Sequence, residues 1–261
     1  MKLAILQAQS PSGDADGALA ALEAVLGAAA AGGAAMLVAP ELFLPGYNCR
    51  RHGDLAQPLG GAWCEQLSQL CRASGCGLVV GLPERSGGSV YNTAIALDAR
   101  GRMLAHYRKR QLFGAAEAAQ FARGERYRLF AFEEHVIGLL ICYDVEFAEH
   151  VRALRSAGAD LIVVPTANML PLTHVPDLLV PARAAEMAVS IAYANYCGAE
   201  GDLVYSGGSA IVGPDGAALA RAGTGPAFLI ADTATAAQVD AAKLSTQVAD
   251  FRPLPPPDSG A

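Results

Sequence analysis

The second half of this chain repeats the first, and this repeat restricts the possible folds more than any other feature of the sequence. Four predicted elements have counterparts: a first strand (3–9 and 136–141), a helix (18–31 and about 146–157), an apolar strand ending in proline (34–40 and 159–165) and a later paired segment (93–105 and 209–220). Two β-α-β-α-β-β units with helices on one face bury their remaining faces by stacking sheet against sheet. We therefore expect an α/β fold, a four-layer α-β-β-α sandwich of two similar halves; the alternative is one doubly wound sheet.

The length of the chain and its apolar content suit one large domain. Of the 261 residues, 52% are hydrophobic and 17% are charged, which is enough apolar material for a sizeable core. We expect a single domain over residues 1–250. Residues 251–261 contain a run of prolines that fits neither a helix nor a central strand, so a Pro-rich C-terminal arm is expected there.

Charge and cysteine spacing exclude several classes of protein. A net charge of −6 argues against nucleic acid as a partner, because phosphate binding requires clustered basic residues and the cluster at 108–110 is short. No apolar run approaches the roughly 18 residues of a membrane span, and the first residues do not resemble a signal peptide, so we expect a cytoplasmic protein. The six cysteines show no zinc-binding or C-x-x-C spacing, so no metal site or disulfide framework is expected.

Cys142 is the candidate nucleophile. It follows the apolar run 137–141 and precedes acidic residues that are typical of a helix start, which places it between the carboxyl end of a strand and the amino end of a helix. Free backbone N–H groups and the helix dipole at such a position favour a thiolate and can hold an oxyanion. The alternative is that Cys142 is a buried apolar residue, as most free cysteines are.

Glu41 and Lys109 are the candidates for the groups that a cysteine nucleophile needs. Each follows a predicted strand, and binding sites in α/β sheets lie beyond the carboxyl ends of the strands. A glutamate can take the thiol proton, and an ammonium can stabilise the oxyanion. The chain has only three lysines against sixteen arginines, which suggests that Lys109 is needed as lysine. Taken singly, each residue has a simpler explanation that is favoured: Glu41 as a helix cap or a solvent-facing side chain, and Lys109 as a surface charge.

Three separated segments resemble the signature motifs of the nitrilase, or carbon-nitrogen hydrolase, superfamily. The segments are Pro40-Glu41-Leu42-Phe43, Tyr107-Arg108-Lys109-Arg110-Gln111-Leu112-Phe113-Gly114 and Leu140-Ile141-Cys142-Tyr143-Asp144-Val145-Glu146-Phe147. The segment around Glu117 is similar to the second-glutamate segment of the family, and Pro165-Thr166-Ala167-Asn168 also fits. The resemblance covers nearly the whole chain.

The resemblance implies an amide hydrolase with a cysteine thioester intermediate and no metal or organic cofactor. In this scheme Glu41 is the general base, Lys109 and the Tyr143 N–H hold the oxyanion, and Glu117 orients Lys109 and the substrate. Substrate contacts are expected from Tyr47, Tyr143, Asn168 and Met169. The resemblance also implies a homodimer, formed through the helices expected at about 146–157 and 177–189.

The segments 165–169 and 193–200 resemble those of 5-aminopentanamidases and related aliphatic amidases of the superfamily. We therefore expect a small, linear aliphatic amide as substrate, with an ω-amine accepted by Glu200, Asp202 or Asp177. Alternative substrates are nitriles, amino-acid amides and deaminated-glutathione-like dipeptides. Two other possibilities are a binding or redox-sensing protein, and a papain-like pair of Cys142 with His135 or His174.

Overall fold

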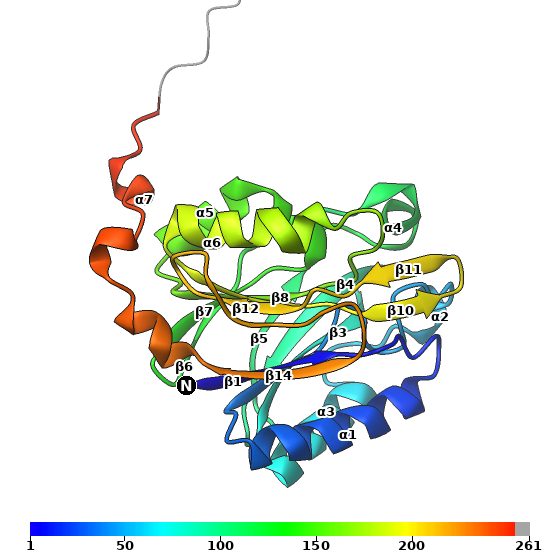
Figure 1. The fold of residues 1–261 in the computed structure, drawn as a ribbon. Helices are drawn as coiled ribbons and strands as arrows, with labels where there is room; N and C mark the ends of the chain where they lie inside the picture. The colour runs from blue at the N-terminus through cyan, green and yellow to red at the C-terminus, as the bar shows by residue number, and fades with distance from the viewer. Residues whose placement is uncertain (254–261) are drawn as a thin grey trace, which may run out of the picture.

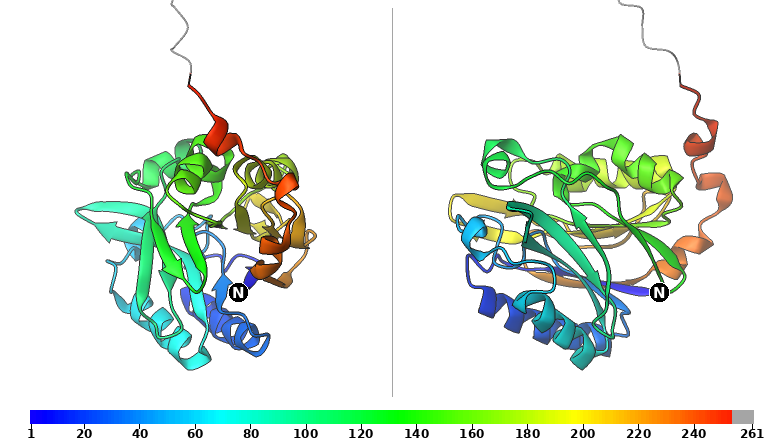
Figure 2. Two further views of the ribbon diagram at one scale, coloured as in Figure 1. Left: turned by 90° about the vertical axis from the view of Figure 1, so that its left-hand side faces the viewer. Right: turned by 180° about the vertical axis from the view of Figure 1, so that it is seen from behind.

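The computed structural model describes residues 1–253, which form four layers. In Figure 1, α5 and α6 cover one sheet, α1 and α3 cover the other, and the two sheets face each other between them. The views in Figure 2 show the same layers from the side and from behind. This arrangement confirms the predicted α-β-β-α sandwich.

The first half of the chain builds one sheet and its helices. The elements are β1 (Lys2–Gln7), α1 (Ala15–Ala31), β2 (Met36–Val38), α2 (His52–Leu55), α3 (Ala62–Ser74), β3 (Gly77–Ser86), β4 (Ser89–Leu97) and β5 (Met103–Arg108). β1, β2 and β3 are parallel, and β4 and β5 continue the sheet in antiparallel fashion. The last strand of the chain, β14 (Ala227–Asp232), pairs with the free edge of β1 and completes a six-stranded sheet.

The second half builds a matching sheet. Its elements are α4 (Gly114–Gln120), β6 (Leu129–Phe132), β7 (His135–Leu139), α5 (Ala148–Ser156), β8 (Leu161–Pro165), α6 (Val180–Met187), β9 (Ser190–Ala194), β12 (Ala210–Val212) and β13 (Ala218–Arg221). β7, β8 and β9 are parallel, as are their counterparts β1, β2 and β3. β6 pairs with β7 as β14 pairs with β1, so each sheet carries an antiparallel strand beside its first strand.

The core follows from the alternation of side chains along buried strands. Leu3 and Ile5 on β1 belong to the cluster that also contains Leu139 and Val163 of the opposite sheet, whereas Ala4 and Leu6 belong to the cluster under α1 and α3. Successive side chains of a strand point to opposite faces, so β1 is apolar throughout because both faces are covered. On α1 the side chains predicted to face the core are buried: Leu19, Leu22, Leu26 and Ala29.

Several predicted boundaries differ from the structure. The helix expected from about residue 146 is a 3-10 helix over Cys142–Glu146 followed by α5, and the helix expected at 177–189 begins as a π-helical turn over Val175–Leu179 before α6. The hairpin of β10 (Cys197–Glu200) and β11 (Leu203–Ser206) was not predicted from the sequence. Each of its strands has only four residues, which is too short for a clear apolar alternation.

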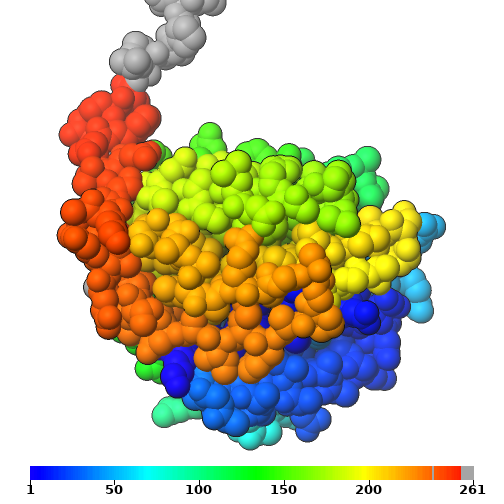
Figure 3. Space-filling model, viewed as in Figure 1, coloured from blue at the N-terminus to red at the C-terminus, as the bar shows by residue number. Residues whose placement is uncertain are grey.

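The end of the described chain lies beside α5 and α6. After β14, two short 3-10 helices and α7 (Gln247–Asp250) run along one side of the molecule, as the orange and red segments of Figure 3 show. The guanidinium of Arg152 on α5 lies 4.7 Å from the ring centre of Phe251. Residues 254–261, most of the predicted C-terminal arm, lie outside the described residues. Within residues 1–253 no helix is long and apolar enough to cross a bilayer.

Candidate active site

The site lies where the equivalent strands β2 and β8 end and the two halves of the molecule meet. The backbone N–H of Glu41, which follows the β2 segment, donates to the carbonyl oxygen of Thr166, which follows β8, over 3.3 Å. Both residues come directly after the prolines that mark the sequence repeat. The repeat therefore places equivalent strand ends against one another, and it brings side chains of both halves to one point.

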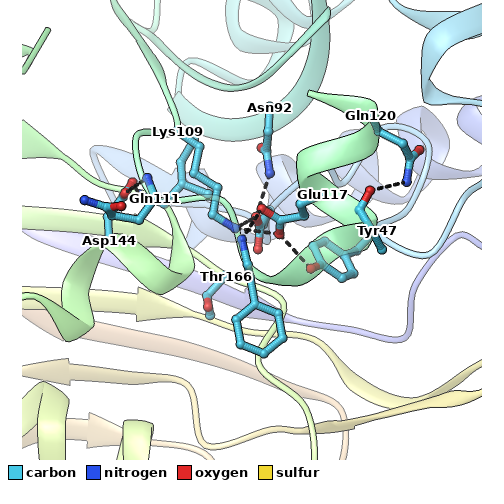
Figure 4. A network of polar contacts seen from close by, with 12 residues as sticks. Tyr47, Asn92, Lys109, Gln111, Glu117, Gln120, Asp144 and Thr166 are labelled. Carbon is cyan, nitrogen blue, oxygen red and sulfur yellow. Dashed lines mark hydrogen bonds and ion pairs between the residues drawn. The ribbon is translucent and has the colours of Figure 1, made fainter. Parts of the chain in front are cut away.

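Lys109 lies between two carboxylates at this point. Its Nζ is 2.6 Å from Oε1 of Glu41 and 2.7 Å from Oε1 of Glu117, and all three side chains are almost completely buried. Figure 4 shows Lys109 and Glu117 approaching each other from separate segments, with Glu117 on the short helix α4. A lysine that loses its water shell needs such partners, because an unpaired buried charge is strongly unfavourable.

The carboxylate of Glu41 has one anchored oxygen and one free oxygen. Oε1 accepts hydrogen bonds from Lys109 and from Nδ2 of Asn92, the latter over 2.7 Å. Oε2 is buried and has no hydrogen-bond partner among the described residues. Asn92 is fully buried on β4, and sequence reasoning did not identify it. The available signal was an amide side chain on a strand that becomes apolar two residues later.

Burial and charge set the protonation behaviour of this cluster. Burial raises the pKa of Glu41 to about 7; the Lys109 ammonium opposes this rise and the Glu117 carboxylate adds to it. For Lys109, burial lowers the pKa, but the carboxylates of Glu41 and Glu117 outweigh it and the net direction is upward. Lys109 is therefore a permanent cation, whereas Glu41 can exchange a proton near neutral pH.

Glu117 is fixed by three donors. Its Oε1 accepts from Lys109 and from the Tyr47 hydroxyl, the latter over 2.6 Å, and its Oε2 accepts the backbone N–H of Phe113 over 2.9 Å. Burial and the adjacent Glu117 raise the pKa of Tyr47, which keeps its hydroxyl protonated and able to donate. Glu117 thus has a fixed orientation from which it holds Lys109.

Cys142 occupies a strained turn beside this cluster. Its φ angle is +46°, a left-handed conformation that a non-glycine residue rarely adopts, and its side chain is only partly exposed. Burial and Glu41 raise the pKa of the thiol, while Lys109, Thr166 and the backbone of Ala167 oppose this rise. The helix start expected beside Cys142 is a 3-10 helix over Cys142–Glu146, and α5 begins only at Ala148. The thiolate stays a prediction.

Asp144 connects the turn of Cys142 to the segment of Lys109. Its Oδ1 accepts the backbone N–H of Gln111 over 2.7 Å, and its Oδ2 accepts the N–H of Ile141 over 3.1 Å and the Tyr107 hydroxyl over 2.9 Å. These bonds fix the residues that flank the nucleophile and the ammonium relative to each other. The sequence analysis did not assign this function to Asp144, although it lies two positions after Cys142.

A cavity of about 560 Å³ adjoins the buried cluster. Its lining is mainly apolar and includes Tyr47, Phe113, Glu117, Phe121, Met169 and Leu203. The Phe113 ring also packs edge-on against Tyr143, which follows Cys142, with ring centres 5.3 Å apart. The cavity is large enough for a small organic molecule whose reactive end approaches the cluster.

The carbon-nitrogen hydrolase family model matches residues 2–243. The chain belongs to this family. The resemblance drawn from the three sequence segments is therefore confirmed.

Proteins with similar sequences support this family membership. This carbon-nitrogen hydrolase is 40% identical to a Pseudomonas protegens protein described as a hydrolase in the pqqF 5′ region, covering 84% of this chain and 78% of that one. It is 34% identical to an (R)-stereoselective amidase of a Pseudomonas species, covering 85% and 81%. It is 31% identical to the human omega-amidase, covering 88% and 87%.

Solved structures of an amidase from Nesterenkonia sp. AN1 have the same fold. One is a variant with acrylamide added to the active-site cysteine; its TM-score is 0.85 at 38% identity, covering 89% of this chain and 92% of that chain. Another variant of the same amidase holds butyramide, with a TM-score of 0.82 at 36% identity, covering 93% and 95%.

The four residues expected to contact substrate lie in different settings in this carbon-nitrogen hydrolase. Tyr47 and Met169 line the cavity, whereas Tyr143 packs against Phe113, a residue of the lining. The side-chain nitrogen of Asn168 donates to the carbonyl oxygen of Leu172 and to Ser206 Oγ, each over 3.0 Å, so it holds the loop after β8. Its contact with substrate stays a prediction.

The three acidic residues considered as amine acceptors also differ in their position relative to the cavity. Asp202 lines the cavity. Glu200 is buried and accepts from the Tyr205 hydroxyl and from the backbone N–H of Asn48. Asp177 pairs with Arg221 and does not line the cavity, so its proposed role as an acceptor is wrong.

The papain-like alternative finds no support. His135 begins β7, at the opposite end of that strand from Cys142, and its ring nitrogens contact Asp160 and Thr233. Among the described residues no histidine forms a hydrogen bond with Cys142.

Proposed function

We propose that this protein hydrolyses small, linear aliphatic amides to a carboxylate and ammonia through a thioester on Cys142. The observation that carries the proposal is the position of Lys109, whose buried ammonium lies between Glu41 and Glu117 beside the turn of Cys142. The similarity to amidases that share the whole fold supports the same reaction.

In the first half of the reaction, the free Oε2 of Glu41 takes the thiol proton as Cys142 Sγ attacks the amide carbon. Because burial raises the pKa of the thiol, we place the removal of its proton together with the attack. The negative charge that develops on the carbonyl oxygen is stabilised by Lys109 and by the N–H of Tyr143. The C–N bond then breaks, and Glu41 returns its proton to the departing ammonia.

In the second half, a water molecule attacks the thioester carbon while Glu41 takes one of its protons. The C–S bond breaks, the carboxylic acid is released, and Cys142 regains a proton from Glu41. A group whose pKa is about 7 can accept and release a proton at neutral pH with little free-energy change, as both halves require. Glu117 and Asn92 do not react; they hold Lys109 and Glu41 in position.

The cavity favours a short aliphatic chain. Its mainly apolar lining suits methylene groups, and Asp202, an exposed carboxylate of the lining that accepts a hydrogen bond from Asn48 Nδ2, is our proposed acceptor for an ammonium on the substrate. A 5-aminopentanamide-like molecule has both features. We keep Tyr47, Tyr143, Asn168 and Met169 as the proposed substrate contacts.

We also infer that residues 1–250 act as one domain, that the protein is cytoplasmic, and that it forms a homodimer through α5 and α6. α5 and α6 form the outer layer on one side of the sandwich, and α7 lies beside them. Sedimentation at micromolar concentration tests the dimer, and a monomeric mass would refute it.

Ammonia release from four compounds tests the reaction and the substrate class. The panel contains 5-aminopentanamide, pentanamide, glutaramate and pentanenitrile. Turnover of the amides supports the proposal, and a higher kcat/KM for 5-aminopentanamide supports the role of Asp202. Turnover confined to the nitrile would overturn the amidase proposal in favour of nitrile hydrolysis.

A further inference from the structure

A second cavity, of about 350 Å³, lies outside the active site and is lined by arginine side chains. Its lining contains Arg108, Arg123, Arg126 and Arg128, together with His106 and Tyr91. We name this group the arginine pocket. One carboxylate, Glu125, also lines it. Four guanidinium groups around one cavity are unexpected in a chain whose net charge is −6.

The arginine pocket lies on the outer face of β5. Tyr107 and Lys109 point toward the core and the active site, where they are almost completely buried, whereas His106 and Arg108 point to the opposite face and are partly exposed. The remaining arginines come from the segment that leads into β6. β5 and β6 are neighbours, as Figure 2 shows from behind.

The charges in the pocket are only partly compensated. Arg108 pairs with Glu84 and stacks on Tyr91, with its guanidinium carbon 3.9 Å from the ring centre. Arg126 and Arg128 form no ion pair and no side-chain hydrogen bond to any residue within 1–253. Burial lowers the pKa of His106. The neighbouring Arg128 and Arg108 lower it further and Glu84 opposes them, in accord with an excess of positive charge.

The pocket is joined to Lys109 through the backbone. The N–H of Gly124 donates to the carbonyl oxygen of Lys109 over 2.8 Å, and Arg110 donates to the carbonyl oxygen of Gly124 over 3.0 Å. A Cβ on Gly124 would lie 2.0 Å from the carbonyl oxygen of Arg108, so the two segments touch with no space between them. A ligand that bridges these segments would therefore also fix the backbone of Lys109.

We propose that the arginine pocket binds a phosphoryl oxyanion, either inorganic phosphate or the phosphate group of a small ester. Guanidinium groups bind phosphate oxygens with paired, charge-assisted hydrogen bonds. Arg126 and Arg128 supply unpaired donors, and the volume leaves room for more than the phosphate itself. The bound anion bridges the 123–128 segment to β5 and steadies Lys109 from the side opposite the active site.

Isothermal titration calorimetry tests this proposal without relying on catalysis. Inorganic phosphate and glycerol 3-phosphate are titrated separately into the wild-type protein at constant ionic strength, with sodium chloride as the reference. We expect saturable binding, at least tenfold weaker in the double variant Arg126→Gln/Arg128→Gln, a loss of about 1.4 kcal/mol. The relative affinities of the two anions distinguish free phosphate from a phosphate ester.

A matched variant and a structural readout complete the test. Arg72→Gln removes one exposed arginine on α3, outside the pocket, and should leave binding unchanged. Hydrogen exchange in peptides covering 108–124 should slow when phosphate is added to the wild type but not to the double variant. The proposal would be overturned if the double variant bound phosphate as tightly as the wild type, if Arg72→Gln weakened binding as much as the double variant does, or if no saturable binding exceeded the chloride reference. These outcomes do not depend on whether the protein proves to be an amidase.

Discussion

The ammonium nitrogen of Lys109 lies 2.6 Å from Oε1 of Glu41, while Oε2 of the same carboxylate has no partner among the described residues. One oxygen therefore fixes the side chain and the other remains available to accept a proton. Because Glu117 is the second partner of the ammonium, Lys109 stays charged even if Glu41 becomes protonated. This division of functions gives the following predictions.

Replacing Cys142 with alanine should abolish ammonia release from amides and leave the fold intact. The side chain is partly exposed and small, so its loss leaves little empty volume. Circular dichroism checks the fold, and mass spectrometry after incubation with acrylamide checks for covalent addition, with Cys64→Ala as the control. Turnover by Cys142→Ala near the wild-type rate would exclude the covalent mechanism.

Lys109→Arg should lower kcat by at least about 10²–10³, the usual effect of losing one oxyanion donor. The guanidinium is longer and forked, and it cannot occupy the point between Glu41 and Glu117. Lys243→Arg is the matched control, because Lys243 is exposed and lies outside the site. Full activity of Lys109→Arg would show that a point charge at this position is not required.

The rate of amide hydrolysis should fall as the pH drops through about 7. The pKa of Glu41 is raised to about 7, and only its ionised form can take the thiol proton, so below this pH kcat/KM should decrease about tenfold per pH unit. A plot of kcat/KM against pH between 5 and 9 measures this decrease, which is the acidic limb of the pH profile. Activity that stays constant down to pH 5 would contradict a role for Glu41 as the base.

Asn92→Ala should move this acidic limb to higher pH. The amide of Asn92 donates to Glu41 over 2.7 Å and lowers its pKa, so removing it favours the protonated acid. A reduced kcat with an unmoved limb would instead indicate a structural effect. Thr93→Val is a suitable control, since Thr93 is the next residue on β4 and bonds to Glu84.

Asp202→Asn should reduce the preference for 5-aminopentanamide over pentanamide. The variant loses a charge-assisted hydrogen bond to the ammonium, so the ratio of the two kcat/KM values should fall. Turnover of pentanamide should change little. An unchanged ratio would exclude Asp202 as the acceptor, and Asp215→Asn, which alters an exposed turn, controls for the loss of net charge.

The sequence by itself determined the stacked arrangement of the two halves and the identities of the reactive side chains. The repeat predicted two stacked sheets, because the spacing of apolar residues and prolines along each half indicates which faces of its strands and helices are buried. Glu41 and Cys142 each follow a predicted strand, and the motifs added Glu117. The buried face of α1 was also predictable from the spacing of Leu19, Leu22 and Leu26.

Only the tertiary structure decided how these groups behave. Asn92 and Asp144 fix the reactive residues from positions with no sequence proximity to Glu41 or Lys109. The sequence predicted a thiolate at Cys142 from a local helix dipole, but the folded protein raises the thiol pKa. The physical reason is that secondary structure depends mainly on neighbouring residues, whereas desolvation and charge pairing depend on which distant segments surround a group once the chain has packed.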